Sequence, residues 1–301
     1  MMDMSTMDNV NTDKSEIIDK RCIQCFLRTY NRLFDKFNVD EHKRNSFLNF
    51  FNEAWSKNEF LPAPQIQQLL NKEFGQIVGE TDPFESEKKE NNTVALELYS
   101  KIKPEAQASA EPFVMALKLA IAGNVMDYGA HSSFDINATI QKALNTEFAI
   151  DHSAELKDRI ESAENILYLG DNAGEIVFDR LFIETISHKN LTFAVRGRPI
   201  LNDVTIEDAV FTGMDKVASV ISNGAGNPST VLADCSKDFI DAFNKADLII
   251  SKGQGNLEGL INQFDSRIFF LLMTKCDVIS DRLNVKKGSF LVVNGLKIKG
   301  V

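Results

Sequence analysis

The residues with the clearest chemical potential lie in the segment Gly170–Glu175. A short apolar run, Ile166–Leu169, is typical of a buried strand, and Asp171 and Asn172 follow it almost at once. A pattern of helical period begins at Glu175. A carboxylate and a carboxamide are therefore expected at the end of a core strand beside a helix N-terminus, where open α/β sheets bind ligands. Oxygen ligands suit a hard cation and a helix N-terminus suits an anion, so the segment predicts a metal and phosphate site.

Three more polar segments follow predicted strands, so all four segments are expected at one edge of the sheet. The carboxyl ends of neighbouring parallel strands share that edge, and polar side chains from several loops can meet there in one cleft. Glycines in these segments allow the backbone to approach a ligand closely. The three segments are Arg196–Asp208, Ser222–Asn227 and Ser251–Asn256.

Each segment also has a purely structural explanation. An aspartate after a strand, such as Asp171, commonly caps the next helix, and Lys252 alone is typical of a solvated surface lysine. Glycine-rich turns are usually only turns, and those at Gly224 and Gly253 lack the full glycine pattern of a dinucleotide-binding motif. The coincidence of four such segments after four strands favours a functional cleft.

Two smaller motifs lie in the N-terminal half. Asn124 and Asp127 are three residues apart at the end of an apolar helical pattern, so they share a face that either lines the cleft mouth or simply ends the helix. Cys22 and Cys25 also share a helical face. A closed zinc site needs four ligands, and the histidines are scattered, so we expect reduced thiols and no zinc.

The composition is that of an ordinary globular protein with an acidic balance. Hydrophobic residues make up 44% of the 301 residues, enough for one large core or two modest ones. A formal net charge of −10 argues against nucleic acid or an anionic membrane as the main partner. No apolar run reaches the length of a membrane span, and neither a signal peptide nor a disulfide framework is evident, so we expect a cytoplasmic protein.

The hydrophobic pattern divides the chain at about residue 160. Before it, apolar spacings of three and four predict helices, interrupted by the polar segment Glu80–Thr93. After it, short apolar runs alternate with helical patterns, which predicts a mostly parallel sheet with helices on both faces. The runs are Ile166–Leu169, Leu191–Val195, Val217–Ile221, Leu248–Ile250, Ile268–Met273 and Phe290–Val293.

The predicted fold is therefore of the α/β class, with two domains. Residues 1–160 are expected to form a helical domain, with a disordered tail over residues 1–15. Residues 161–301 are expected to form a Rossmann-like, three-layer α/β/α domain that carries the metal and phosphate site.

Taken together, the motifs resemble the damage-control phosphatase family of metal-dependent phosphohydrolases. The similarity is greatest to the prokaryotic subgroup, which carries an N-terminal CxxC motif. The family's fold is a helical domain plus a three-layer α/β domain, in agreement with the hydrophobic pattern. The motifs stand in the family's order and are Cys22–Cys25, Asp82–Phe84, Ala122–Asp127, Gly170–Glu175, Pro199–Asp208 and Lys252–Asn256.

The resemblance implies a divalent cation of the Mg, Mn, Co or Ni class. Its expected ligands are Asp171, Asn172 and Asp203, with Asp208 as the alternative to Asp203. Lys252 and Asn256 would then contact the phosphate of a small phosphorylated metabolite, such as a sugar phosphate.

The expected reaction is metal-assisted hydrolysis of a phosphomonoester, by either a water molecule or an aspartate carboxylate. Lys252 and backbone N–H groups near Gly174 are expected to stabilise the transition state. Glu175 or Asp208 is the expected base. Asn124, Asp127, Gly174, Asn223 and Asn256 complete the set of expected substrate contacts.

Two other functions stay open at this point. One is a carboxyl methyltransferase that uses S-adenosylmethionine, although no glycine-rich turn followed by a ribose-binding acid stands out. The other is a regulator that binds a metal or a nucleotide without catalysis. In the enzyme, Glu80–Thr93 and the helical domain could form a lid that sets substrate choice.

Overall fold

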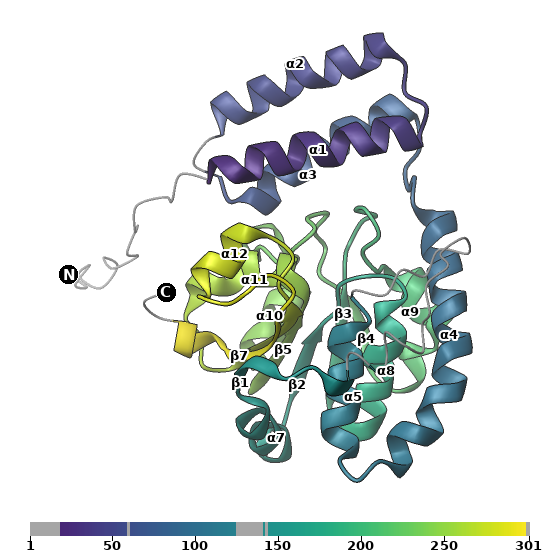
Figure 1. Ribbon diagram of the computed structural model, residues 1–301, viewed down its shortest axis with the longest axis vertical. Helices are drawn as coiled ribbons and strands as arrows, with labels where there is room; N and C mark the ends of the chain where they lie inside the picture. Colours follow the sequence, from purple (N-terminus) through teal and green to yellow (C-terminus); the bar gives the residue numbers. More distant parts are fainter. Residues whose placement is uncertain (1–18, 59–60, 125–140, 142–143, 299–301) are drawn as a thin grey trace, which may run out of the picture.

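A computed structural model describes residues 19–58, 61–124, 141 and 144–298, and its centre is a seven-stranded sheet (Figure 1). The strand order is β1-β7-β6-β5-β2-β3-β4, and every neighbouring pair is parallel except β6 and β7. The strands are β1 Phe148–Asp151, β2 Ile166–Leu169, β3 Leu191–Val195, β4 Ser219–Ser222, β5 Leu248–Lys252, β6 Ile268–Met273 and β7 Phe290–Asn294.

The central strand β2 fixes where the polar segments end up. Its last residue, Leu169, pairs with Ala194 of β3 on one side and with Ser251 of β5 on the other. The three strands therefore end at the same level, and the segments that follow them emerge side by side. The predicted three-layer α/β/α arrangement is confirmed.

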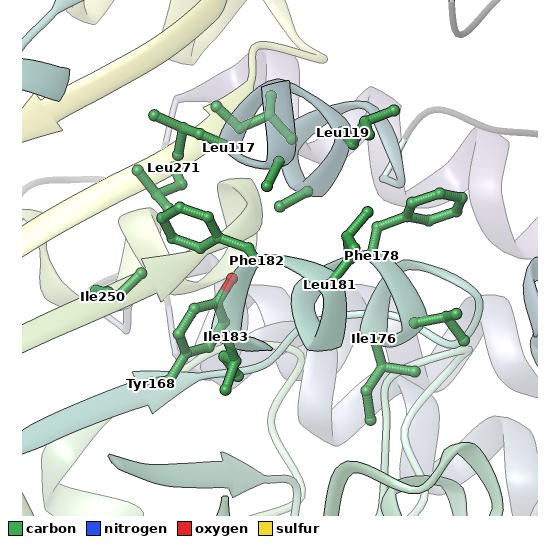
Figure 2. Packing of buried hydrophobic residues seen from close by; sticks show 14 of the residues in the cluster. Leu117, Leu119, Tyr168, Ile176, Phe178, Leu181, Phe182, Ile183, Ile250 and Leu271 are labelled. Carbon is green, nitrogen blue, oxygen red and sulfur yellow. The ribbon is translucent and has the colours of Figure 1, made fainter. Parts of the chain in front are cut away.

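One face of the sheet is covered by a layer of helices, among which α5 and α8 lie against the central strands. Tyr168 and Ile250 project from the sheet into this layer, where Phe182 of α8 and Leu117 of α5 meet them (Figure 2). These side chains are fully buried, so the apolar faces of the helices explain their docking. The helices on this side are α4 Glu85–Ala108, α5 Pro112–Ala122, α7 Ser153–Ser162, α8 Glu175–Ile186 and α9 Ile206–Thr212.

The opposite face carries the second core. Alternate residues of the same strands, such as Leu167 and Ile249, pack there against Phe239 and Leu257. The helices on this side are α10 Lys237–Lys245, α11 Gly253–Leu260 and α12 Asp277–Arg282. Short helical turns complete the domain: η1 Met214–Lys216, η2 Leu232–Asp234, η3 Ile261–Gln263 and η4 Gly295–Ile298.

The first three helices form a separate layer, here called the helical cap (α1 Lys20–Lys36, α2 Glu41–Lys57 and α3 Ala63–Val78). An aromatic cluster around Phe34, Phe47 and Phe74 is its own core. Figure 1 shows the cap above one end of the sheet. Leu201 from the segment after β3 packs into the cap core, and Gln65 of α3 bonds to Asp234 over 2.9 Å. The cap therefore lies on the edge where the polar segments emerge.

Three expectations about the elements were wrong. The predicted domain boundary at residue 160 falls inside α7 and after β1, a sheet strand whose alternating, partly exposed pattern hides it among the helices. Most of Glu80–Thr93 is not a break, because α4 begins at Glu85. The strand expected at Val217–Ile221 is β4 at Ser219–Ser222. The predicted tail and Asp127 lie outside the described residues.

No helix in the described part of the chain is both long and apolar enough to cross a lipid bilayer.

Candidate active site

Backbone pairing brings the first two polar segments together at the carboxyl edge of the sheet. Asn172 and Asp203 form an isolated antiparallel bridge between their loops. The N–H of Val204 donates to the carbonyl of Asp171 over 2.9 Å. Because these bonds fix both loops, Asp171 and Asp203 are placed near each other by the fold itself.

Arg196 joins the two carboxylates. Its Nε donates to Oδ2 of Asp203 over 2.6 Å, and one terminal nitrogen lies 3.5 Å from Oδ1 of Asp171. The other terminal nitrogen donates to Oδ1 of Asn256 over 2.9 Å. All four side chains are buried. The predicted proximity of Asp171 and Asp203 is thus present in the structure.

The negative charges of Asp171 and Asp203 are only partly compensated by their surroundings, so the pKa values of both groups are raised. Burial, the nearby Asp203 and Glu175 raise the pKa of Asp171 to about 7, although Arg196 and Lys275 oppose the rise. Burial also raises the pKa of Asp203. A further positive charge between the two groups would relieve this repulsion, as expected for a cation site.

The side-chain oxygens of Asp171, Asn172 and Asp203 are ligands of the kind that a hard divalent cation prefers. The amide nitrogen of Asn172 donates to Oδ2 of Asp171 (2.7 Å) and to Oε2 of Glu175 (3.1 Å), which leaves its carbonyl oxygen available. Within the described residues, Oδ1 of Asp203 likewise has no hydrogen-bond donor, since Arg196 uses only Oδ2. Only two of these groups are carboxylates, and no group of three or more His, Cys, Asp or Glu in the described chain could hold a metal.

Gly253 allows the backbone of its segment to lie very close to the carboxylate of Asp171. A Cβ atom on Gly253 would lie 1.9 Å from Oδ2 of Asp171, and its φ of +76° is a conformation that side chains disfavour. The same oxygen of Asp171 accepts a bond of 2.7 Å from the amide of Asn124. Asn124 therefore contacts Asp171, whereas Asp127, which was expected to share its face, lies outside the described residues.

Lys252 does not occupy the expected position. Its ammonium donates to the carbonyl of Ala120 (2.8 Å), to Glu175 (2.6 Å) and to Asp179 (2.5 Å), and its side chain is fully buried. All three ammonium protons are thus used by buried acceptors and none is available for a phosphate. The side chain that was expected to contact a phosphate instead neutralises two buried carboxylates.

These residues form the buried charge cluster, defined as Tyr168, Glu175, Asp179 and Lys252. Tyr168 donates to Oδ1 of Asp179 over 2.8 Å, whereas Oδ2 of Asp179 is buried without a partner. Burial and Glu175 raise the pKa of Asp179 to about 7, against the influence of Lys252. Glu175 is fully enclosed and bonded on both oxygens, so the geometry gives no support to its expected role as a base.

Asp208, the alternative ligand or base, is also structural. Its carboxylate accepts bonds from the backbone of Thr205 (3.0 Å), Lys88 (2.9 Å) and Asn92 (3.0 Å). Asn92 in turn accepts the N–H of Gly174 over 2.7 Å. That N–H was expected to stabilise the transition state, but it is already used to hold the turn at Gly174.

Asn223 and Asn256 organise loops. The side-chain oxygen of Asn223 accepts the backbone N–H groups of Gly197 (3.0 Å) and Ala225 (2.9 Å). Asn256 donates to the carbonyls of Gly170 (3.1 Å) and Lys252 (2.8 Å). Both side chains are buried and hold backbone in place, so neither is displayed as a substrate contact.

Lys275 is a site residue that the sequence did not reveal. It follows β6 at the same edge of the sheet, its side chain is exposed, and its ammonium bonds to Oδ1 of Asn124. Its positive charge lowers the pKa of both Asp171 and Asp203. No sequence motif includes Lys275, but its position two residues after a core strand could have predicted that it lies at the same edge as the other polar segments. Arg196, Lys88, Asn92 and Asp179 were also missed.

Cys22 and Cys25 share α1, as expected, and both are free thiols. Cys22 is half-buried, and burial raises the pKa of its thiol.

The fold and site define an α/β protein with buried acidic residues at the carboxyl edge of a mostly parallel sheet. The model of the damage-control phosphatase ARMT1-like domain matches residues 18–291. The chain belongs to this family of damage-control phosphatases.

Individual relatives agree. The damage-control phosphatase PH1575 of Pyrococcus horikoshii is 35% identical over 280 residues, which cover 91% of this chain and 96% of that protein. A damage-control phosphatase of Archaeoglobus fulgidus is 32% identical and covers 74% of this chain and 79% of its own length. The crystal structure of the P. horikoshii protein, a DUF89 family member, superposes with a TM-score of 0.86 at 34% identity over 92% of this chain and 99% of that chain.

Proposed function

We propose that this protein hydrolyses phosphomonoesters of small metabolites with the help of a divalent cation. The observation that carries the proposal is the facing pair of buried carboxylates, Asp171 and Asp203, in a protein of a phosphatase family. Asp171, Asn172 and Asp203 would hold the cation. When bound, it would neutralise phosphoryl oxygens and so favour attack at phosphorus.

The chain's own residues supply the rest of the phosphate site. Lys275 is an exposed cation beside Asn124, so its ammonium is well placed to leave Asn124 and bind a phosphoryl oxygen. Asn124 positions Asp171 through its amide nitrogen. Lys252 keeps Glu175 in place, and Glu175 accepts from the amide nitrogen of Asn172, so the carbonyl oxygen of Asn172 would be available to hold the cation.

The helical cap would select the substrate by size. Leu201 and the Gln65–Asp234 bond fix the cap above the edge of the sheet that carries the site. Small phosphorylated metabolites, such as sugar phosphates, fit beneath such a cover better than a phosphoprotein does. A cytoplasmic location would suit this substrate class.

The test is release of inorganic phosphate from a panel of sugar phosphates and related esters with Mg²⁺, Mn²⁺, Co²⁺ or Ni²⁺. We expect release that EDTA abolishes. Lys275→Gln should lower turnover by about a hundredfold, the usual scale for one lost oxyanion donor. Lys237→Gln, on an exposed α10 ion pair, is the matched control and should be neutral.

Absence of EDTA-sensitive phosphate release across the panel would overturn the proposal. Binding of S-adenosylmethionine under those conditions would instead favour the methyltransferase. Metal or nucleotide binding without turnover would favour the regulator.

A further inference from the structure

Arg196 is the most extensively bonded side chain between the two acidic residues of the site. It contacts Asp203 at 2.6 Å, Asn256 at 2.9 Å, Thr230 at 3.4 Å and Asp171 at 3.5 Å, and it is only 3% exposed. The sequence placed Arg196 in the polar segment Arg196–Asp208 but assigned it no role. A buried guanidinium in this position must either compete with a cation or prepare the site for one.

The frame around Arg196 is independent of the two carboxylates. Its backbone N–H donates to the carbonyl of Val204 over 2.9 Å. Asn256, which accepts one arm of the guanidinium, is itself fixed by the carbonyls of Gly170 and Lys252 and by the hydroxyl of Thr230. The guanidinium of Arg196 is therefore positioned by its backbone, directly after β3, and by Asn256 of α11, in addition to its contact with Asp203.

The bonds made by Arg196 leave Oδ1 of Asp203 open and hold Asp171 only through a long contact. It takes Oδ2 of Asp203, whereas Oδ1 of Asp203 has no donor within the described residues. Its distance of 3.5 Å to Asp171 is long for a charge-assisted bond, so this contact yields readily. The positive charge also offsets the repulsion between Asp171 and Asp203. This arrangement prepares a site and does not block it.

We propose that Arg196 is a positioning residue that keeps Asp171 and Asp203 together before a divalent cation binds and keeps its bond to Oδ2 of Asp203 afterwards. The inference rests on the proposed function for its cation, but the coupling of Arg196 with Asp203 needs no metal. The role requires the planar guanidinium of arginine, whose three nitrogens reach Asp203, Asn256 and Asp171, and not merely a positive charge.

The first experiment measures thermal unfolding of the metal-free protein in EDTA. Arg196→Gln leaves Asp203 buried without its partner, so the midpoint should fall by roughly 5–10 °C. In the double variant with Asp203→Asn the loss should be clearly less than the sum of the single losses. Strictly additive losses would overturn the proposal. Arg196→Lys keeps the charge and serves if Arg196→Gln does not fold.

The second experiment measures Mn²⁺ binding by calorimetry, without substrate. Arg196→Gln and Arg196→Lys should each weaken binding by about 10–100-fold, the scale for losing a group that orients a ligand. Arg267→Gln is the matched control, because Arg267 forms a similar pair with Asp265 at the start of β6, on the opposite edge of the sheet. Its affinity should equal that of the wild type.

The outcomes separate the two proposals. A wild type that binds Mn²⁺ with the same affinity as both Arg196 variants would overturn the role of Arg196 and leave the metal-dependent phosphatase intact. Tighter binding in Arg196→Gln would show that Arg196 competes with the cation, and would also overturn it. A wild type that binds none of the four cations would remove the metal site of the proposed function, even if Arg196 and Asp203 proved coupled.

Discussion

At the scale of single residues, similar carboxylates have very different tasks. Asp171 and Asp203 face each other at the cleft, whereas Glu175, Asp179 and Asp208 are each held by buried hydrogen bonds. Glu175 and Asp208 have both oxygens engaged, and Asp179 is fully buried, so none of the three can easily accept a substrate proton or bind an ion. Burial and hydrogen-bond partners, and not residue type, therefore distinguish the expected metal ligands from the carboxylates that support the fold.

Asp171→Asn should reduce phosphate release by at least about a hundredfold, because the cation loses a charged ligand while the side-chain volume is kept. Metal-dependent hydrolysis of the best ester in the panel is the measurement. Asp247→Asn is the control, since Asp247 bonds to backbone N–H groups at the opposite edge of the sheet. Equal activity of Asp171→Asn and the wild type would contradict the metal assignment.

Lys252→Met should destabilise the fold by about 3–5 kcal/mol, since it leaves the carboxylates of Glu175 and Asp179 buried without their cation. Urea unfolding measures the loss. Adding Asp179→Asn to this variant should restore part of it, because one buried charge disappears. An unchanged free energy of unfolding would mean that Lys252 is not the counter-charge of the buried charge cluster.

At the scale of elements, α4 acts as a clamp on the site. One turn of this helix places Lys88 against Asp82 and Asp208, and Asn92 against Asp208 and Gly174. The turn at Gly174, with φ of +80°, is thereby tied to the N-terminus of α9. Most of the segment Glu80–Thr93, which could have formed a lid, belongs to α4 and supports the turn at Gly174.

Asn92→Ala should cost about 2 kcal/mol, because it strands the buried N–H of Gly174 and one oxygen of Asp208. Catalytic turnover should fall as well, since the turn that carries Asn172 loses its anchor. Urea unfolding and phosphate release are measured on the same preparation. Asn91→Ala, next to it on α4 and only partly buried, should change neither quantity; equal losses in both variants would refute the clamp.

At the scale of the whole molecule, the buried charge cluster should make stability depend on pH. The pKa of Asp179 is raised from 3.8 to about 7 by burial and by Glu175. The folded state thus binds this proton more tightly than the unfolded state. The stability that the group contributes is complete below pH 4 and is lost as pH rises towards 7.

The expected slope from this group is on the order of 1 kcal/mol per pH unit between about pH 4 and 7. Urea unfolding of the metal-free wild type and of Asp179→Asn across this range measures it. The variant should show the shallower fall in stability with increasing pH. Parallel curves for the two proteins would show that Asp179 does not carry the proton.

The sequence alone determined six of the seven strands, the helices that alternate with them and the edge at which the polar segments emerge. Short, fully apolar runs such as Ile166–Leu169 and Ile268–Met273 admit little other than buried parallel strands, and the polar segments after them had to emerge at one edge. Their position after a core strand singled out Asp171 and Asn172, and the family resemblance added Asp203 to the expected ligand set.

Tertiary structure decided what each polar side chain faces. The sequence cannot tell that Lys252 is buried against Asp179 whereas Lys275 is exposed beside Asn124, because each lies at or just after the carboxyl end of a strand. Nor does it show that Lys88 and Asn92 reach Asp208, more than a hundred residues away. Burial, partner and charge balance arise only when distant segments pack, and those properties separate a ligand from a support.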